Sequence, residues 1–298
     1  MISATAFFVA FAAAIFLTPV VRGVAHSTGL LDPPEGRKVH EVAVPRLGGF
    51  AIATAFYLGM AIALAAARIA FGRRVGIETG HLPAILAGVA LIAGLGLLDD
   101  LQSMRARVKL GAQFVIVLGV WGMGLSIDRL DGPWGSLDLE AWAFPVTILW
   151  MLAVINAMNL IDGIDGLAAG VALIGFAAFF AVALLLGGST PIQPLLAAAA
   201  GGVLGFLLGA AAINVTQAGR HGMPPWVPLL ILALPLADTC RVVVMRLAAR
   251  QPIFRPDRRH VHYGLLRLGI SQQGAIVLLW GVSALLAGFG VLLAALAF

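Results

Sequence analysis

The sequence predicts an all-α protein that crosses a membrane many times. Of its 298 residues, 61% are hydrophobic and 11% are charged, and the mean hydropathy is +1.01. Soluble domains are less apolar than this and carry about 25% charged residues. Apolar stretches of roughly 20 residues, long enough to span a bilayer as a helix, recur along the chain between short polar breaks. These stretches are expected to form one transmembrane helical bundle.

Nine stretches are long and apolar enough to be spans. The first, residues 4–24, is expected to be an uncleaved helix, because it has no basic leader and no small-residue cleavage site. The others are expected at residues 47–71, 82–98, 108–127, 142–160, 167–186, 194–213, 224–247 and 275–298. No long polar linker divides the chain, so residues 1–298 are expected to form a single membrane domain of nine to ten spans.

Positive charge is concentrated in a few of the predicted loops, and cytoplasmic loops are typically rich in Lys and Arg. The segment 128–140 has four carboxylates and one arginine and is expected outside. Arg73 and Arg74 also lie on the predicted outer side, which counts against this scheme. The net charge of +5 therefore indicates topology, and no basic stripe suggests nucleic-acid binding. The loops expected in the cytoplasm are those with Arg37, Lys38 and Arg46, with Arg105, Arg107 and Lys109, and with Arg250, Arg255, Arg258, Arg259 and Arg267.

The span count disagrees with this scheme at one loop. The last basic loop follows the eighth predicted span, which would place it outside, whereas the other polar clusters follow spans one, three and five. Five arginines favour the cytoplasm. Either a segment within 187–237 crosses irregularly, shielded by protein, or one crossing has been deleted.

Asp99 and Asp100 lie at the end of a predicted span. Adjacent helical residues point about 100° apart, so the two carboxylates could divide their roles, one near a cation and one near a proton or phosphoryl group. The alternative is a solvated helix end. Lys109 follows ten residues later, and it can join the aspartates only if residues 102–107 turn the chain back.

The stretch NAMNLIDGIDG places Asn156, Asn159, Asp162 and Asp165 at a spacing of three in apolar surroundings. A carboxylate at the centre of a membrane helix costs about 2.5–3.5 kcal/mol. The glycines at positions 163 and 166 favour a helix end at 162–166, which would let the amides and carboxylates converge. The alternative is polar contact between helices.

Two further polar groups lie near the C-terminus. His260 and His262 are two residues apart among several arginines, a donor-rich surface suited to phosphate oxygens of a ligand or of anionic lipid headgroups. Asp238 and Arg241 are expected to form a structural pair on one helix face. The single cysteine, Cys240, excludes an intramolecular disulfide.

Four stretches in this order, RKVHEVAVPRLGG, DDLQSMRARVKLGAQ, NAMNLIDGIDGLAAG and PDRRHVHYGLLRLG, resemble the polyprenyl-phosphate N-acetylhexosamine-1-phosphate transferases, the family of the WecA and MraY enzymes. The WecA-like branch is more similar. The resemblance implies transfer of a sugar 1-phosphate from a UDP-N-acetylhexosamine, such as UDP-GlcNAc, to polyprenyl (undecaprenyl) phosphate, with release of UMP. It implies a multi-pass protein of the bacterial inner membrane, with catalytic loops on the cytoplasmic face, in cell-envelope polysaccharide synthesis; a homodimer is left open.

The resemblance also implies roles for individual residues. Asp99 and Asp100 would lie beside the attacking lipid phosphate, and Asn159 would bind Mg²⁺ or Mn²⁺. The other implied substrate-binding residues are Lys109 at the pyrophosphate, Asn156, Asp162 and Asp165 at the nucleotide, and Arg259, His260 and His262 at the diphosphate or sugar. Oxygen ligands of this kind suit Mg²⁺, and phosphoryl transfer depends mainly on positioning and charge neutralisation.

One acidic motif of the family is absent from this sequence. Residues 204–226, where an FMGDxGS-like loop is expected, read LGFLLGAAAINVTQAGRHGMPPW and contain no carboxylate. The alternative to an active transferase is therefore a catalytically impaired homologue that binds nucleotide sugar, lipid or a partner protein.

Overall fold

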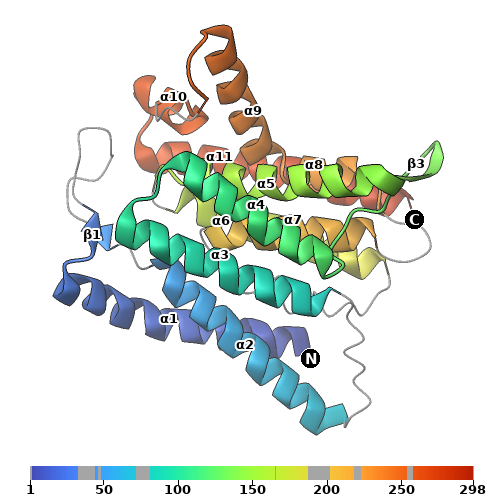
Figure 1. Cartoon of the computed structure of the whole chain (residues 1–298), viewed down its shortest axis with the longest axis horizontal. Coiled ribbons are helices and arrows are strands. Elements are labelled where there is room, and N and C mark those ends of the chain that lie inside the picture. Colours follow the sequence, from blue (N-terminus) through green and yellow to red (C-terminus); the bar gives the residue numbers. More distant parts are fainter. Residues whose placement is uncertain are drawn as a thin grey trace.

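The computed structural model describes residues 2–32, 44–45, 48–71, 81–164, 166–186, 202–217, 223–253 and 258–297, and helices dominate it (Figure 1). Two short antiparallel strand pairs, β1 with β2 and β3 with β4, add to the predicted all-α fold. The strands are β1 (Leu31–Asp32), β2 (Val44–Pro45), β3 (Arg129–Gly132) and β4 (Gly135–Asp138). The helices are α1 (Ile2–Thr28), α2 (Gly48–Phe71), α3 (Leu82–Gln102), α4 (Ala106–Gly122), the short 3-10 helix η2 (Glu140–Trp142), α5 (Ala143–Ile161), α6 (Leu167–Leu185), α7 (Gly202–Thr216), α8 (Trp226–Ile231), α9 (Ala233–Ala248), α10 (Val261–Arg267) and α11 (Gln272–Ala297).

Six helices of the described part are long and apolar enough to cross a membrane: α1, α2, α3, α5, α6 and α11. The structure therefore does not confirm the nine to ten predicted spans. Helices α4 and α7 contain 17 and 15 residues, short of the roughly 20 that a bilayer requires. The predicted span 224–247 is two helices, α8 and α9.

A proline explains why the span predicted at 224–247 is interrupted. Pro235 has no N–H to donate to the carbonyl of Ile231, so an unbroken helix would lose a hydrogen bond and clash at this turn. Helix α8 ends at Ile231, and α9 begins after Leu232 with Pro235 in its first turn. Helix α9 then leaves the direction of the long helices and stands out from the bundle beside α10 (Figure 1).

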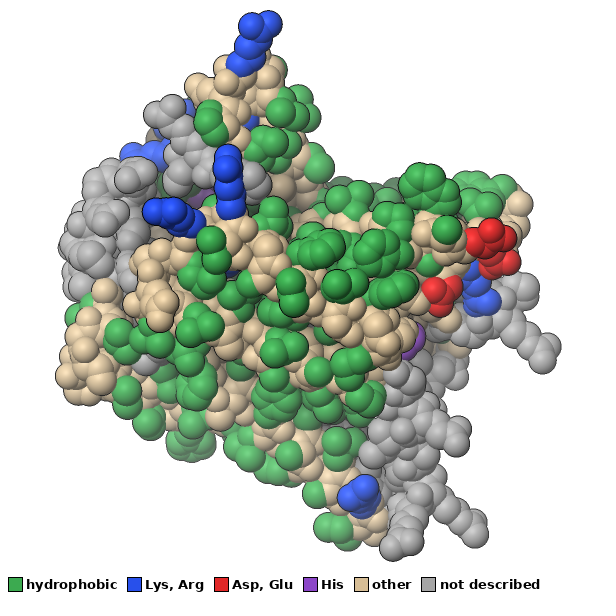
Figure 2. Space-filling view, in the orientation of Figure 1, with side chains coloured by type: hydrophobic (Ala, Val, Ile, Leu, Met, Phe, Trp, Pro, Cys, Tyr) green, Lys and Arg blue, Asp and Glu red, His purple; other side chains and the backbone are tan. Residues whose placement is uncertain are grey.

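The exposed surface of the long helices is hydrophobic. On α11, for example, Leu285 and Leu296 are 77% and 75% exposed. Figure 2 shows hydrophobic side chains spread over the middle of one face, basic side chains around α9 and acidic ones near β3. Such an apolar surface is stable in lipid and unfavourable in water, so the chain is a multi-pass membrane protein.

The bundle has two chemically different ends. At one end, which we call the motif end, α1, α3 and α5 finish and α2, α4, α6 and α11 begin; this end lies next to β1 and α10 (Figure 1). The hairpin end carries β3 and β4, whose loop reverses at Gly135 with φ +96°. Gln217, just after α7, accepts hydrogen bonds there from the amides of Asp128 and Arg129.

Helix α7 packs closely against α5 because glycines face it. A Cβ at Gly205 would lie 2.7 Å from the Cα of Ile155, and one at Gly209 would lie 2.8 Å from the sulfur of Met151. The indole N–H of Trp150 donates to the carbonyl of Gly209 at 3.2 Å. Helix α7 therefore packs against the part of α5 that directly precedes Asn156 and Asn159.

Candidate active site

The chain turns back between α3 and α4, as the position of Lys109 requires. Ser103 adopts the left-handed conformation (φ 48°) and ends α3, with its amide donating to the carbonyl of Asp99. The amide of Met104 donates to Asp99 Oδ1 at 2.9 Å, so this carboxylate also supports the turn. Lys109 Nζ reaches Asp99 Oδ2 at 2.8 Å. The condition for Lys109 to join the aspartates, a chain that turns back within 102–107, is therefore met.

Helix α5 brings its two asparagines to this turn. Lys109 Nζ lies 3.4 Å from Asn159 Oδ1, so the ammonium lies between the ends of α3 and α5. One turn earlier, Asn156 Nδ2 donates to Gln113 Oε1 of α4 at 2.8 Å. Asn156 is therefore a link between α4 and α5, and Gln113, which is 2% exposed, is a polar partner that the sequence analysis missed.

A cavity of about 220 Å³ lies where these helix ends meet. Its polar lining consists of Asp99, Asp100, Lys109, Gln113, Asn159 and Asp162. Three carboxylates and one ammonium give the lining a formal charge of −2. A half-enclosed site of this charge attracts cations, and a cation inside it would also attract phosphate groups.

The junction of α5 and α6 is a tight turn, as the two glycines predict. Helix α5 ends at Ile161, the amide of Gly163 donates to the carbonyl of Ile161 at 2.8 Å, and Gly166 has φ +88° before α6. Asp162 caps α5 and lines the cavity. Asp165 lies outside the described residues, and so do Arg255 and residues 33–43 of the first motif.

The histidine loop packs directly on this turn. A Cβ placed on Gly163 would lie 2.2 Å from His262 Nε2, so the imidazole lies against the glycine backbone. The rings of His260 and His262 are stacked, with centroids 5.9 Å apart and planes 7° apart. The histidine loop therefore lies at the same end of the bundle as Asp162. Its position after the eighth predicted span would have placed it at the opposite end.

His262 is fully buried, and within the described residues neither of its ring nitrogens has a hydrogen-bond partner. Burial, helped by the charge of His260 and opposed by Asp238, lowers the pKa of His262 from 6.5 to about 4. The ring is therefore neutral at neutral pH. A neutral imidazole can donate through one nitrogen and accept through the other, but His262 packs against the turn and is not among the residues that line the cavity.

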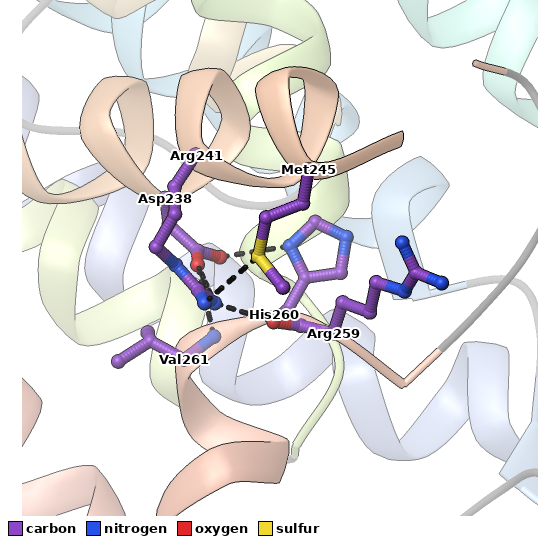
Figure 3. Close-up of polar contacts among 6 residues, drawn as sticks. All are labelled: Asp238, Arg241, Met245, Arg259, His260 and Val261. Carbon is purple, nitrogen blue, oxygen red and sulfur yellow. Dashed lines mark hydrogen bonds and ion pairs between the residues drawn. The ribbon is translucent and has the colours of Figure 1, made fainter. Parts of the chain in front are cut away.

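A buried carboxylate holds the start of the histidine loop (Figure 3). Asp238 of α9 accepts from His260 Nδ1 at 2.8 Å, from the amide of Val261 at 2.9 Å and from Arg241 at 3.1 Å. Burial alone would raise the pKa of Asp238, but the hydrogen bond and charge of His260, with the other donors, lower it below 3.8. The predicted pair with Arg241 is confirmed; the longer-range bonds to His260 and Val261 were not predicted.

Of the described residues, several arginines lie around the histidines and none of them lines the cavity. Arg259 donates to the side-chain oxygen of Gln251 at 2.8 Å, and Arg241 donates to the carbonyl of Arg259. The guanidinium of Arg258 lies 6.0 Å from the ring centroid of Tyr263. Arg259, His260 and His262 thus form a second polar group beside the α5–α6 turn, separate from the residues that line the cavity.

The cavity can supply only part of a metal coordination sphere. Its side-chain oxygen ligands are the amides of Asn159 and Gln113 and the carboxylates of Asp99, Asp100 and Asp162, a set of the kind that Mg²⁺ and Mn²⁺ prefer. Both oxygens of Asp99 already accept hydrogen bonds, and no three acidic, histidine or cysteine residues of the described ranges form a metal-binding group. The donor set fits a magnesium ion that keeps waters and substrate phosphates as ligands.

The sequence is similar to a protein family and to proteins named as transferases. The family model described as Glycosyl transferase family 4 matches residues 82–209, the segment that carries every polar residue of the cavity. The chain is 31% identical to the probable undecaprenyl-phosphate N-acetylglucosaminyl 1-phosphate transferase of Bacillus subtilis (strain 168), over 92% of this chain and 80% of that protein.

Two further relatives have similar identity. The undecaprenyl-phosphate alpha-N-acetylglucosaminyl 1-phosphate transferase of Escherichia coli (strain K12) is 30% identical over 91% of this chain and 78% of that protein. The decaprenyl-phosphate N-acetylglucosaminephosphotransferase of Mycobacterium tuberculosis (strain CDC 1551 / Oshkosh) is 30% identical over 89% and 76%. With the four motifs and a cavity lined by residues of three of them, these matches show that the chain belongs to glycosyl transferase family 4.

Proposed function

We propose that this protein transfers N-acetylglucosamine 1-phosphate from UDP-GlcNAc to polyprenyl phosphate and releases UMP. The observation that carries the proposal is the cavity at the motif end, where Asp99, Asp100, Lys109, Asn159 and Asp162 converge from three helices. Relatives along nearly the whole chain are named as transferases of this kind. Among the described residues, no contact favours a non-catalytic role.

In the proposed reaction, an oxygen of the lipid phosphate forms a bond to the sugar-linked phosphorus of UDP-GlcNAc. The bond from that phosphorus to the bridging oxygen breaks, and UMP leaves with this oxygen. The protein forms no covalent bond to the substrates in this step, so its contribution to catalysis is mainly positioning of the substrates and neutralisation of their charge. Lys109, held by Asp99, places a positive charge where the diphosphate would lie.

A divalent cation, Mg²⁺ or Mn²⁺, would neutralise the diphosphate and stabilise the leaving UMP. Asn159 would supply an amide oxygen to it, and Asp100 or Asp162 a carboxylate. Each oxygen of Asp99 already accepts one hydrogen bond, from Met104 or from Lys109, so Asp99 keeps the α3–α4 turn and the Lys109 ammonium in place.

UMP release by the purified protein tests this proposal. UDP-GlcNAc, undecaprenyl phosphate and Mg²⁺ should give UMP, a chelator should stop the release, and Mn²⁺ should restore it. Asn159→Ala should abolish activity, whereas Asn214→Ala, the same exchange near the hairpin end where Asn214 contacts His81, should leave it near normal. No UMP from any of several UDP-sugars would contradict the proposal.

We further propose that the motif end faces the bacterial cytoplasm. The supply of UDP-sugars there and the arginines around α9 and α10 support this orientation. In a Cys240→Ser background, an impermeant maleimide added to intact cells should label Trp134→Cys at the hairpin and spare Arg258→Cys. Both positions are exposed, so labelling of position 258 from outside would refute this orientation.

A further inference from the structure

Asp238 is buried and its hydrogen bonds converge on one segment of the chain. Its side chain is 3% exposed, and an unpaired carboxylate at such a site would cost several kcal/mol. Arg241, on the same helix, is one partner. The other two, His260 and Val261, come from the far side of the loop that joins α9 to α10. Two contacts from outside α9 would be unnecessary if Asp238 served only the Arg241 pair.

The contact with His260 fixes which ring nitrogen carries a proton. An ionised carboxylate only accepts hydrogen bonds, so His260 Nδ1 must be the donor at 2.8 Å. In the neutral ring, Nε2 then has a lone pair and lies on the edge turned away from Asp238. The bond to the adjacent amide of Val261 restrains the ring from a second point.

His260 is in turn connected to the cavity through packing. Its ring stacks on His262, and His262 lies on Gly163, the residue after the cavity-lining Asp162. Asp238, His260, His262 and the α5–α6 turn therefore form one continuous packed path. The orientation of His260 relative to Asp162 depends on a residue that neither lines the cavity nor belongs to any of the four motifs.

We propose that Asp238 is a positioning residue of the transferase: it holds His260 with Nδ1 protonated, so that Nε2 accepts a hydrogen bond from a hydroxyl or acetamido group of the nucleotide sugar. The assignment rests on the proposed function. Asp238 itself touches no substrate and takes part in no bond change. Fixing a histidine tautomer by a buried carboxylate is an efficient way to orient a ring whose two nitrogens differ in role.

Asp238→Asn tests the proposal, because the asparagine keeps the shape of the side chain. Its amide nitrogen would donate to Nδ1 and leave the proton of His260 on Nε2. Protein labelled with ¹⁵N-histidine in detergent should show His260 protonated at Nδ1 in the wild type and at Nε2 in the variant, with the signal assigned by its loss in His260→Gln.

Kinetics separate positioning from a merely structural role. In the UMP assay, Asp238→Asn should lower kcat/KM by about 10-fold to 1,000-fold, whereas Asp138→Asn, the same exchange on the exposed β4, should change it by less than about 2-fold. In a His260→Gln background, Asp238→Asn should have little further effect, since the two residues act as one unit.

Three results would overturn the proposal: a wild-type His260 with a proton on Nε2 at neutral pH, whether or not Nδ1 is also protonated, an Asp238→Asn variant with unchanged tautomer and activity, or losses that multiply with those of His260→Gln. The wild-type spectrum decides the first even if Asp238→Asn does not fold. A wild-type protein that releases no UMP would contradict the proposed function, and the spectra would still report on the Asp238–His260 pair.

Discussion

Replacing Gly163 by alanine adds one methyl group at the contact between the α5–α6 turn and the histidine loop. That methyl would lie 2.2 Å from Nε2 and 2.6 Å from Cε1 of His262, where ordinary contacts begin at 3.4 Å. His262 is fully buried, so its ring cannot move without displacing neighbours. The φ of Gly163 lies outside the left-handed region, so the cost of the substitution is steric.

The size of the effect follows from the overlap. The imidazole or the turn must move by roughly 1 Å, and overpacking of this kind costs about 1–3 kcal/mol. A displacement of about 1 Å near reacting groups can also cost about 100-fold in rate. Gly163→Ala should therefore lower both the thermal unfolding temperature in detergent and kcat/KM for UMP release.

Gly264 provides a matched control in the neighbouring helix α10. A Cβ there would meet nothing within 4 Å, and alanine is favoured over glycine in a helix by about 0.5–1 kcal/mol, so Gly264→Ala should be neutral or stabilising. Combining Gly163→Ala with His262→Ala should cost less than the sum of the two changes, because the ring that clashes is gone. Wild-type stability and activity in Gly163→Ala, or strict additivity in the double variant, would refute the packing argument.

Three further predictions follow from single contacts. Lys109→Met removes the ion pair with Asp99 and should reduce UMP release by at least about 100-fold with little change in unfolding temperature; near-normal turnover would exclude a role at the diphosphate. The pKa of His262 is about 4 in the fold and about 6.5 in the unfolded chain, so the unfolded state binds more protons between these two pH values. The free energy of unfolding should therefore fall as the pH decreases from about 6.5 to about 4, by up to about 3 kcal/mol. Thermal unfolding at about pH 7 and about pH 5 should show a smaller loss in His262→Gln than in the wild type, and equal losses would show that another group is responsible. Gln113→Leu leaves Asn156 without its partner on α4 and should lower the free energy of unfolding by about 1 kcal/mol, measured by denaturant titration, with an unchanged value indicating that the bond contributes nothing.

Much of the local structure could be predicted because its causes are local. The glycines of NAMNLIDGIDG end α5 where the sequence indicates, since Gly166 adopts a φ that other residues avoid. The turn at Ser103 brings Lys109 back to Asp99 over ten residues. The span predicted at 224–247 is not confirmed as one helix, because hydropathy does not register the missing N–H of Pro235, where one helix ends and another begins.

The sequence by itself determined that this is a helical membrane protein with polar clusters at span ends, because burial in lipid demands long apolar helices and leaves few places for charge. Only the tertiary structure decided which clusters meet. His262 contacts Gly163, which is 99 residues away in the sequence, and Asp238 binds His260, which is 22 residues away. No periodicity encodes such pairings, because they depend on how α9 and α10 pack against the end of α5. That packing brings the histidine loop to the α5–α6 turn, on the side of the bundle from which the span count had excluded it.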